Sequence, residues 1–356
     1  MKKEGDVLLR DLIKELTEAH GLTGFEHEAA KVVEKYFKSY SDEIKIDKMG
    51  SLSAIKKGKA QNPKRIMLAA HMDEIGLMVK KIDDKGFIQF TNIGGIDQRT
   101  LLTQEVIVHG KKKLFGVIGS KPPHLLEASE KKKAVKMEDM LIDVGFSKDE
   151  VEKYVSVGDP ITIRRKMLNL QNDMVAGKAL DDRAGVAVMY ECLKELSKMN
   201  HDCDVYAVAT VQEEVGYRGA IPATYHISPH IGIAIDVGFG STPELPKDET
   251  SDLGKGPCIG FGANIHPKVY EKLVEVAKEY NIPYQQEIYP GATGTDAWGM
   301  QITRGGVATG LISIPLRYMH TSVETININD IKNAGKLLAY FIVSLNGEDL
   351  EGMLCY

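Results

Sequence analysis

Short apolar segments that alternate with amphipathic helical segments constrain the fold of this chain more than any other feature of its sequence. The apolar segments occupy residues 66–70, 205–211, 231–235 and 307–314. They are short enough to be strands that are buried on both faces of a sheet. Helical spacing of apolar residues marks the segments 8–16, 29–37, 183–199, 269–280 and 329–344. Strands that alternate with helices predict an α/β fold, with a mixed, mostly parallel sheet flanked by helices.

The segment 76–165 has a different texture, because strand-like alternation with glycine turns replaces the helical spacing. This pattern predicts a small β-rich, barrel-like domain that is inserted into the larger one. A chain of 356 residues is long enough for two domains of about 150 residues each. Residues 121–136 are rich in lysine but lack interleaved aromatic residues, so we interpret them as a surface loop.

Composition and charge narrow the possible partners. Acidic residues outnumber basic ones by 50 to 45, and the net charge of −5 argues against a general nucleic-acid or anionic-membrane binder. No apolar run approaches the roughly 20 residues of a membrane span. The four cysteines, at positions 192, 203, 258 and 355, form no Cys-x-x-Cys pair and are too few for a disulfide framework. We therefore expect a reduced, cytoplasmic protein with no nucleic-acid and no membrane partner.

Acidic and imidazole side chains follow the predicted buried strands. His71 and Asp73 come directly after the first strand, the pair Glu213-Glu214 after the second, and Asp236 after the third. Ligands of open α/β sheets bind beyond the carboxyl ends of the strands, so these side chains are candidates for one site. Asp181 and His320 complete the inventory of candidate residues. Mixed imidazole and carboxylate donors suit zinc, cobalt or manganese, and a pair of metal ions usually needs a shared carboxylate.

Each of these signals also has a simpler interpretation. A histidine at a strand end is often a hydrogen-bonded structural residue, and a Glu-Glu pair is usually solvated. The Asp181-Asp182-Arg183 run can be a helix N-terminus, where acidic residues interact favourably with the helix dipole. Asp236 could lie in a turn. The joint occurrence of all these signals at the ends of predicted buried strands favours a common site.

Five motifs occur together in one order along the chain. They are His71-x-Asp73, the run 179–183 (Ala-Leu-Asp-Asp-Arg), the run 213–220 (Glu-Glu-Val-Gly-x-x-Gly-Ala), Asp236-Val237 and the run 319–322 (Met-His-Thr-Ser). This set resembles the dinuclear-metal aminopeptidases of the tetrahedral (TET) type, over essentially the whole chain. That family includes glutamyl and deblocking aminopeptidases and proteins labelled endoglucanase M or FrvX-like. The resemblance implies a zinc-exopeptidase-like catalytic domain that hydrolyses N-terminal residues from peptides with a free N-terminus.

The resemblance also implies metal ligands, residue by residue. Asp181 would bridge two divalent metal ions, with zinc or cobalt as the expected metals. His71 and Asp236 would complete the coordination of one ion. Glu214 and His320 would complete that of the other.

Two further acidic residues receive implied roles. Glu213 would act as the general base that takes a proton from the attacking water and passes it to the leaving amine. Asp73 would hydrogen-bond and orient the imidazole of His71. Residues 291–297 form a Gly-rich turn into a helix, in which Thr295 or Asp296 is expected to be the N-cap and which the resemblance places near the substrate.

The candidate ligands lie on both sides of the β-rich segment. A catalytic domain of residues 1–75 and 166–356 is therefore expected to be discontinuous, with residues 76–165 as an inserted oligomerisation domain. In the resembled family, such domains assemble dimers into a hollow dodecamer, so a homo-oligomer is expected here.

Two other classes of protein remain as alternatives. An endoglucanase-type glycoside hydrolase would use Glu213 and Glu214 as its acid and base, although such carboxylates usually face each other about 5–9 Å apart from different elements. A non-catalytic metal-binding scaffold would need the ligands but not Glu213.

Overall fold

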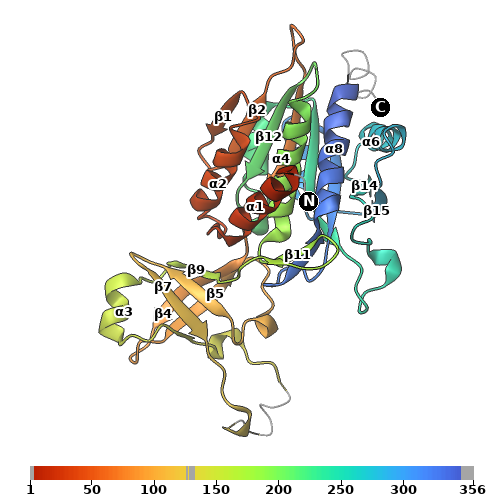
Figure 1. Ribbon diagram of the computed structural model, residues 1–356. Coiled ribbons are helices and arrows are strands. Elements are labelled where there is room, and N and C mark those ends of the chain that lie inside the picture. The colour runs from red at the N-terminus through yellow and green to blue at the C-terminus, as the bar shows by residue number, and fades with distance from the viewer. Residues whose placement is uncertain (1–3, 126, 128–132, 346–356) are drawn as a thin grey trace.

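An eight-stranded mixed sheet forms the centre of the larger part of the molecule (Figure 1). The computed structural model describes residues 4–125, 127 and 133–345. The spatial order of the strands is β1-β2-β12-β3-β13-β16-β14-β15. Their bounds are β1 Glu43–Ile46, β2 Leu52–Lys56, β3 Arg65–His71, β12 Asp204–Thr210, β13 Ile231–Phe239, β14 Cys258–Gly262, β15 Gln285–Tyr289 and β16 Ala308–Leu316.

Strands β12, β3, β13 and β16 run parallel to one another, and antiparallel pairings join β2 to β12 and β14 to β16. This arrangement confirms the predicted mixed, mostly parallel sheet. The register pairs Thr210 with His71 and Asp236 with Ser313, so the carboxyl ends of the parallel strands meet at one edge. The polar residues that follow these strands are thereby brought to the same place, as expected for an open α/β sheet.

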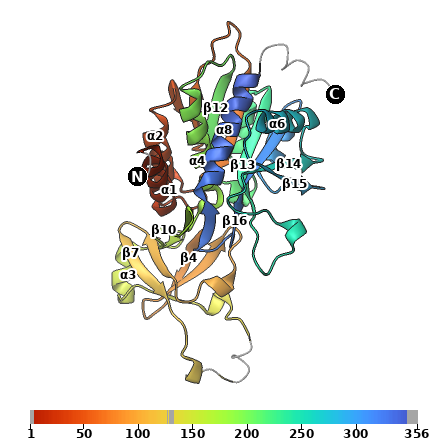
Figure 2. The same cartoon turned by 45° about the vertical axis from the view of Figure 1, so that its right-hand side comes forward.

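Helices cover both faces of the sheet, and Figures 1 and 2 show those of the larger layer. One face packs against α1 Glu4–Glu18, α2 His27–Phe37, α4 Leu180–Leu196, α6 Pro267–Glu279 and α8 Ile328–Ser344. The other packs against the short helices α5 Ala220–Ile227 and α7 Asp296–Gln301. Buried aliphatic residues on both sides of the central strands explain why those strands are continuous apolar runs in the sequence.

Six strands close into a barrel below the larger part, on the lower left of Figure 1. They are β4 Gly76–Ile82, β5 Ile88–Ile93, β6 Glu105–His109, β7 Lys113–Ile118, β8 Ile142–Asp143 and β9 Pro160–Ile163, in the spatial order β4-β5-β8-β7-β6-β9. Their inward side chains form a separate hydrophobic core with Val151 of helix α3 Lys148–Tyr154. The predicted barrel-like insertion is therefore present as a closed barrel.

A third, small sheet lies between the two parts of the molecule. Its strands are β10 Leu168–Asn169, β11 Met174–Gly177 and β17 Glu324–Asn327, in that spatial order. Strand β11 leads directly to α4, and β17 leads to α8 through the N-cap Asn327. This sheet therefore brings the segment before α4 next to the segment that follows His320.

The segment 260–262 carries two glycines and forms the end of strand β14. The missing side chain at Gly260 lets β14 approach β16, because a Cβ there would lie 3.1 Å from the Cβ of Leu311. Within the described part of the chain, no helix is long and apolar enough to cross a membrane.

Candidate metal centre

The candidate ligands converge at the carboxyl edge of the parallel strands in two groups that share one residue. His71, Asp181 and Asp236 offer ligand atoms within 4.8 Å of one another, and so do Asp181, Glu214 and His320. His71 is the last residue of β3, and Asp236 lies in β13. The structure thus brings together all five residues that the sequence nominates as ligands.

Asp181 lies between the two groups with one carboxylate oxygen toward each. Its Oδ1 lies 3.2 Å from Nε2 of His71, and its Oδ2 lies 3.3 Å from Nε2 of His320. Nε2 of His320 also lies 3.6 Å from Oε1 of Glu214. Asp181 and Asp182 have non-helical dihedral angles at the start of α4, which turns the Asp181 side chain out of the helix. The central position of Asp181 is the geometry that a bridging carboxylate requires.

Glu213 and Glu214 form a single 3-10 turn directly after β12. The turn begins at Gln212, whose φ of 55° bends the chain away from the strand direction. Oε2 of Glu213 lies 3.9 Å from Nε2 of His71, whereas Glu214 faces His320. The two neighbouring carboxylates therefore point to different parts of the site, as expected where a chain turns at a strand end.

The carboxylate of Asp73 holds this turn through hydrogen bonds to its backbone. Its Oδ1 accepts a hydrogen bond from the backbone N–H of Glu213 at 3.0 Å, and its Oδ2 accepts from the N–H of Glu214 and the hydroxyl of Thr23. The Nδ1 of His71 lies 3.5 Å from Oδ1 of Asp73 and 3.2 Å from the Asp73 carbonyl oxygen. Asp73 thus contacts both the imidazole, as expected, and the Glu-Glu turn, which the sequence does not suggest.

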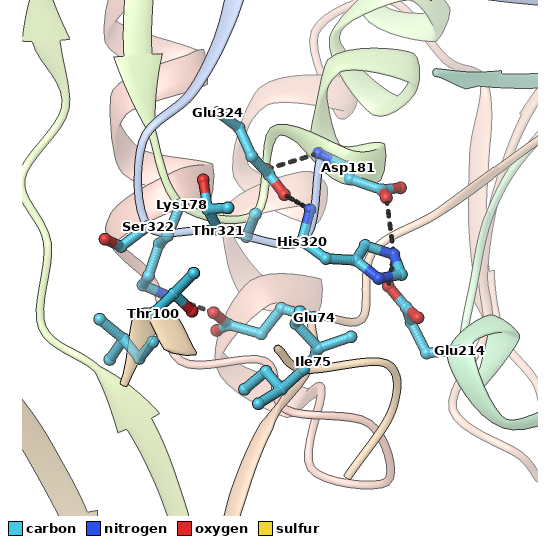
Figure 3. Close-up of a pocket in the computed structure, with 13 residues that line it drawn as sticks. Glu74, Ile75, Thr100, Lys178, Asp181, Glu214, His320, Thr321, Ser322 and Glu324 are labelled. Atoms are coloured by element: carbon cyan, nitrogen blue, oxygen red, sulfur yellow. Dashed lines mark hydrogen bonds and ion pairs between the residues drawn. The ribbon is translucent and has the colours of Figure 1, made fainter. Parts of the chain in front are cut away.

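Glu324 lies outside the motifs that the sequence singles out. Its Oε2 accepts hydrogen bonds from the backbone N–H groups of Leu180 and Asp181, at 2.7 and 3.1 Å, and its Oε1 accepts from the N–H of His320 at 2.9 Å. Figure 3 shows this carboxylate between the two candidate ligands. The buried Glu324 therefore links the backbone of the proposed bridge to that of a histidine ligand.

A second buried network lies beside the site, and the sequence does not suggest it either. Glu74 pairs with Lys178 (Figure 3), and its Oε1 lies 3.2 Å from the guanidinium of Arg183. Arg183 is fully buried and also donates to the carbonyl oxygens of Leu16, Ala19 and Met72. This network ties the end of β3 to the start of α4, the two elements that carry His71 and Asp181.

The barrel also reaches the site. Nδ1 of His320 lies 2.8 Å from the carbonyl oxygen of Gly95, in the loop that follows β5. Since that carbonyl can only accept a hydrogen bond, Nδ1 carries a proton. In the neutral imidazole, Nε2 then keeps its lone pair, and it faces Asp181 and Glu214. The inserted segment therefore sets the tautomer of a candidate ligand.

Burial and neighbouring negative charges disfavour the ionised forms of several carboxyl groups in the site. Burial raises the pKa of Glu213 to about 10 and that of Glu214 to about 7, in part because neighbouring carboxylates add to the effect. Burial likewise raises the pKa of Asp236. Burial opposes ionisation of Asp181 as well, but its contacts with His320 and His71 hold its pKa below the usual range. A divalent cation would stabilise all of these carboxylates, so the donor set fits metal binding.

A cavity of about 630 Å³ opens from the candidate metal centre. Thr295 lines it and is the N-cap of α7, with a side chain that accepts from the N–H of Ala297. The N-cap prediction is therefore confirmed for Thr295 and wrong for Asp296. Asp296 is buried instead, where its Oδ2 accepts a hydrogen bond from the hydroxyl of Thr210 at 2.6 Å.

Comparison with known proteins gives consistent results. A model of a family described as M42 glutamyl aminopeptidase matches residues 50–337. The lysyl aminopeptidase of Pyrococcus furiosus is 40% identical over 344 residues, which cover 95% of this chain and 98% of that relative.

Two solved structures extend the likeness to the fold. An aminopeptidase from the archaeon Desulfurococcus kamchatkensis superimposes with a TM-score of 0.91 at 41% identity, over 98% of each chain. A Pyrococcus horikoshii TET1 peptidase superimposes with a TM-score of 0.84 at 32% identity, over 95% of this chain and 100% of that one. That TET1 peptidase can assemble into a tetrahedron or a large octahedral shell.

The fold and the site define a metal-dependent aminopeptidase. The chain belongs to the M42 family of aminopeptidases, which are metallopeptidases. The resemblance drawn from the motifs is therefore confirmed. The glycoside-hydrolase alternative loses its support, because the family hydrolyses peptides and because Glu213 and Glu214 share one turn instead of facing each other across a sugar bond.

Proposed function

We propose that this aminopeptidase uses two divalent cations, held by two ligand groups that share Asp181. His71 and Asp236 would complete one group, and Glu214 and His320 the other. The observation that supports this assignment is the position of Asp181, whose two carboxylate oxygens face the two imidazoles at 3.2 and 3.3 Å. Zinc or cobalt fits the mixture of imidazole and carboxylate donors.

The bound cations would supply Lewis-acid activation, which makes water a nucleophile near neutral pH and polarises the scissile carbonyl. Glu213 would accept the proton of the attacking water at a carboxylate oxygen. It would then donate this proton to the nitrogen of the leaving amine, so the amine departs neutral. The hydrogen bond from its N–H to Asp73 holds Glu213 in the turn that aims it at the site.

Asp73 and Glu324 would orient the site without touching the substrate. Asp73 holds the turn of Glu213 and Glu214 and contacts His71, and Glu324 holds the backbone of Asp181 and His320. Such hydrogen bonds reduce the freedom of ligand side chains and commonly change metal affinity by about 10–100-fold when removed.

We also propose how the chain is divided into domains, how its copies assemble and where the protein is located. Residues 1–75 and 166–356 would form the catalytic domain and residues 76–165 the oligomerisation domain, in support of which all barrel strands lie between Gly76 and Ile163. Dimers would assemble into a dodecamer, and the TET1 relative, which can assemble into a tetrahedron, supports a large closed assembly. A reducing, cytoplasmic location is consistent with the free, buried thiols of Cys192, Cys203 and Cys258.

The proposed chemistry is tested by metal removal and by one substitution. Dialysis against EDTA should abolish hydrolysis of aminoacyl-p-nitroanilides, and zinc or cobalt should restore it. Glu213→Gln should bind the same number of metal ions as the wild type but lose about 10²–10⁴-fold in kcat, the range for a general base. Glu279→Gln, on the exposed end of α6, is the matched control. Wild-type turnover in Glu213→Gln would contradict the assigned role.

A further inference from the structure

The cavity beside the candidate metal centre is lined by more acidic residues than the candidate ligands account for. Besides the candidate ligands and Glu213, the charged residues that line it are Asp248, Glu249 and Glu287, and no lysine or arginine among the described residues lines it. Apolar side chains of Val237, Ile288 and Met319 contribute to the same walls. A cavity with apolar walls and an excess of carboxylates suits a ligand with an aliphatic stem and a cationic end.

Of the three carboxylates that line this cavity besides the candidate ligands and Glu213, Glu287 is the most buried, whereas Asp248 and Glu249 are exposed. Glu287 lies on β15, and a Cβ added to Gly238 would lie 2.7 Å from its Oε1. Gly238 is two residues beyond Asp236 on β13, so the glycine leaves room for the Glu287 carboxylate close to the metal centre. The position of Glu287 is therefore fixed relative to the reacting end of a substrate.

One oxygen of Glu287 is left without a partner. Oε2 is buried and accepts no hydrogen bond from the described residues, while hydrogen bonds from Tyr289 and Ser313 reach the carboxyl group elsewhere. Burial raises the pKa of Glu287 in spite of those two hydrogen bonds. A buried carboxylate with an unpartnered oxygen costs free energy, and a cationic group that pairs with the carboxylate from the cavity would offset this cost.

We propose that Glu287 makes the enzyme select peptides whose N-terminal residue is lysine or arginine. This inference rests on the proposed aminopeptidase function and adds the substrate class. The ammonium or guanidinium group of the first residue pairs with the Glu287 carboxylate, and the aliphatic stem packs on Val237 and Met319. The scissile carbonyl of the same residue then lies at the metal centre.

The rim of the cavity agrees with this assignment. Asp248 and Glu249 are exposed on a short 3-10 helix, Lys247–Glu249, where they attract cationic peptides. Lys247, on the same short helix, lines a neighbouring hollow and not this cavity. An acidic first residue would meet three carboxylates, and the described lining of the cavity offers it no lysine or arginine.

The test uses substrates that differ by a single charge. Lysyl- and norleucyl-p-nitroanilide have side chains of similar length and differ in the terminal ammonium group. With the metal-loaded full-length enzyme, we expect kcat/KM for the lysyl substrate to exceed that for the norleucyl one by about tenfold or more, the effect of one charge-assisted hydrogen bond. In Glu287→Gln the ratio should fall to near one, because only the lysyl substrate loses a charged partner. Glu279→Gln should keep the wild-type ratio.

Binding provides a readout that does not depend on turnover. L-lysine should compete with the norleucyl substrate more strongly than L-norleucine does, and Glu287→Gln should remove this difference. An equal loss on both substrates in Glu287→Gln would overturn the proposal, because it would mean that Glu287 binds the α-amine common to all substrates. A wild-type preference for norleucyl or glutamyl substrates would overturn it as well. Failure to hydrolyse any aminoacyl substrate after metal loading would instead contradict the aminopeptidase function itself.

Discussion

Glu324 shows how one carboxylate can fix the positions of two candidate ligands relative to each other. It accepts backbone hydrogen bonds from Asp181 and His320, which come from segments about 140 residues apart in the chain. In Glu324→Gln one carboxylate oxygen becomes an NH₂ donor that faces backbone N–H groups, so one segment loses its acceptor. We expect zinc affinity, measured by titration calorimetry of the metal-free enzyme, to fall by about 10–100-fold. Unchanged affinity, equal to that of the control Glu279→Gln, would show that Glu324 does not position the ligands.

The sequence predicts the candidate ligands but not the residues that hold them. His71, Glu214 and Asp236 are recognisable because each ends or follows a predicted apolar strand, and the sheet brings strand ends together. Glu324 is at the start of β17, a four-residue strand whose pairing with β11 is not visible in any local pattern. Its role depends on a contact between distant segments, which residue spacing does not encode.

At the scale of elements, the loop after β5 carries a contact from the barrel to the metal centre. A Cβ on Gly95 would lie 2.9 Å from Nδ1 of His320, closer than neighbouring atoms allow. Gly95→Ala should therefore displace the His320 imidazole and lower zinc affinity and kcat/KM, each by about tenfold or more. Gly119→Ala is the matched control in the same barrel, because a Cβ there meets no atom within 4 Å. Equal activity of the two variants would show that the loop adapts and that this contact does not set the ligand geometry.

A pair of histidines connects the end of α1 to the barrel and makes stability depend on pH. His20, in the loop after α1, stacks on His109 at the end of β6 with ring centroids 3.7 Å apart. Burial lowers the pKa of His20 to about 4 and that of His109 to about 3, although Glu28 and Glu74 oppose the effect. In the unfolded chain both pKa values return to about 6.5.

The unfolded chain therefore binds more protons than the folded one below pH 6.5. The stability that this pair provides is fully present above about pH 6.5, decreases progressively below that pH, and is lost once the pH has fallen through the folded pKa values of about 4 and 3. His109→Gln should reduce the loss of unfolding free energy between pH 7 and pH 5 by about 1–2 kcal/mol, measured by urea denaturation. His226→Gln, at an exposed position on α5, should leave the slope unchanged. The same slope in all three proteins would contradict the contribution of the pair.

The elements that the sequence predicts well are those whose apolar residues follow one clear pattern, either a continuous apolar run or helical spacing. The central strands and the long helices appear close to their predicted positions, since burial on both faces or along one stripe leaves a clear pattern. Strand β14 is missed because Gly260 and Gly262 contribute no side chain to that pattern, although Gly260 is what allows β14 to approach β16. Local composition is misleading there because close packing of neighbouring strands requires the absence of a side chain.

On the scale of the whole molecule, the position of the barrel links assembly to activity. The barrel segment supplies Gly95 to the candidate metal centre of the same chain, where its carbonyl oxygen lies 2.8 Å from Nδ1 of His320. Its outer surface carries apolar side chains as well: Phe115 is 65% exposed and Val117 is 49% exposed on the outward face of β7. Exposed apolar residues that alternate outward on a barrel strand are typical of a surface that another subunit covers.

If the barrel mediates assembly, the wild type should sediment as a particle of about 470 kDa, the mass of twelve chains of 39.3 kDa. The double variant Phe115→Asp/Val117→Asp should sediment as a smaller species, because each carboxylate would have to be desolvated in the interface. Hydrolysis of an aminoacyl-p-nitroanilide should remain within about threefold of the wild type, since all candidate site residues come from one chain. Lys85→Asp, in the exposed turn before β5, is the control for charge. It tests whether negative charge added elsewhere on the barrel is enough to dissociate the assembly.

The two measurements together separate assembly from catalysis. A closed shell with inward-facing sites would admit short peptides and exclude folded proteins, so the smaller species should gain access to the free N-terminus of a folded protein while keeping its rate on the small substrate. A wild type that sediments as a dimer would contradict the shell. A variant that stays at about 470 kDa would show that the contact lies elsewhere than the outward face of β7. Loss of activity on the small substrate in the dissociated variant would mean that a neighbouring subunit completes the site, contrary to the single-chain geometry of Asp181, His320 and Gly95.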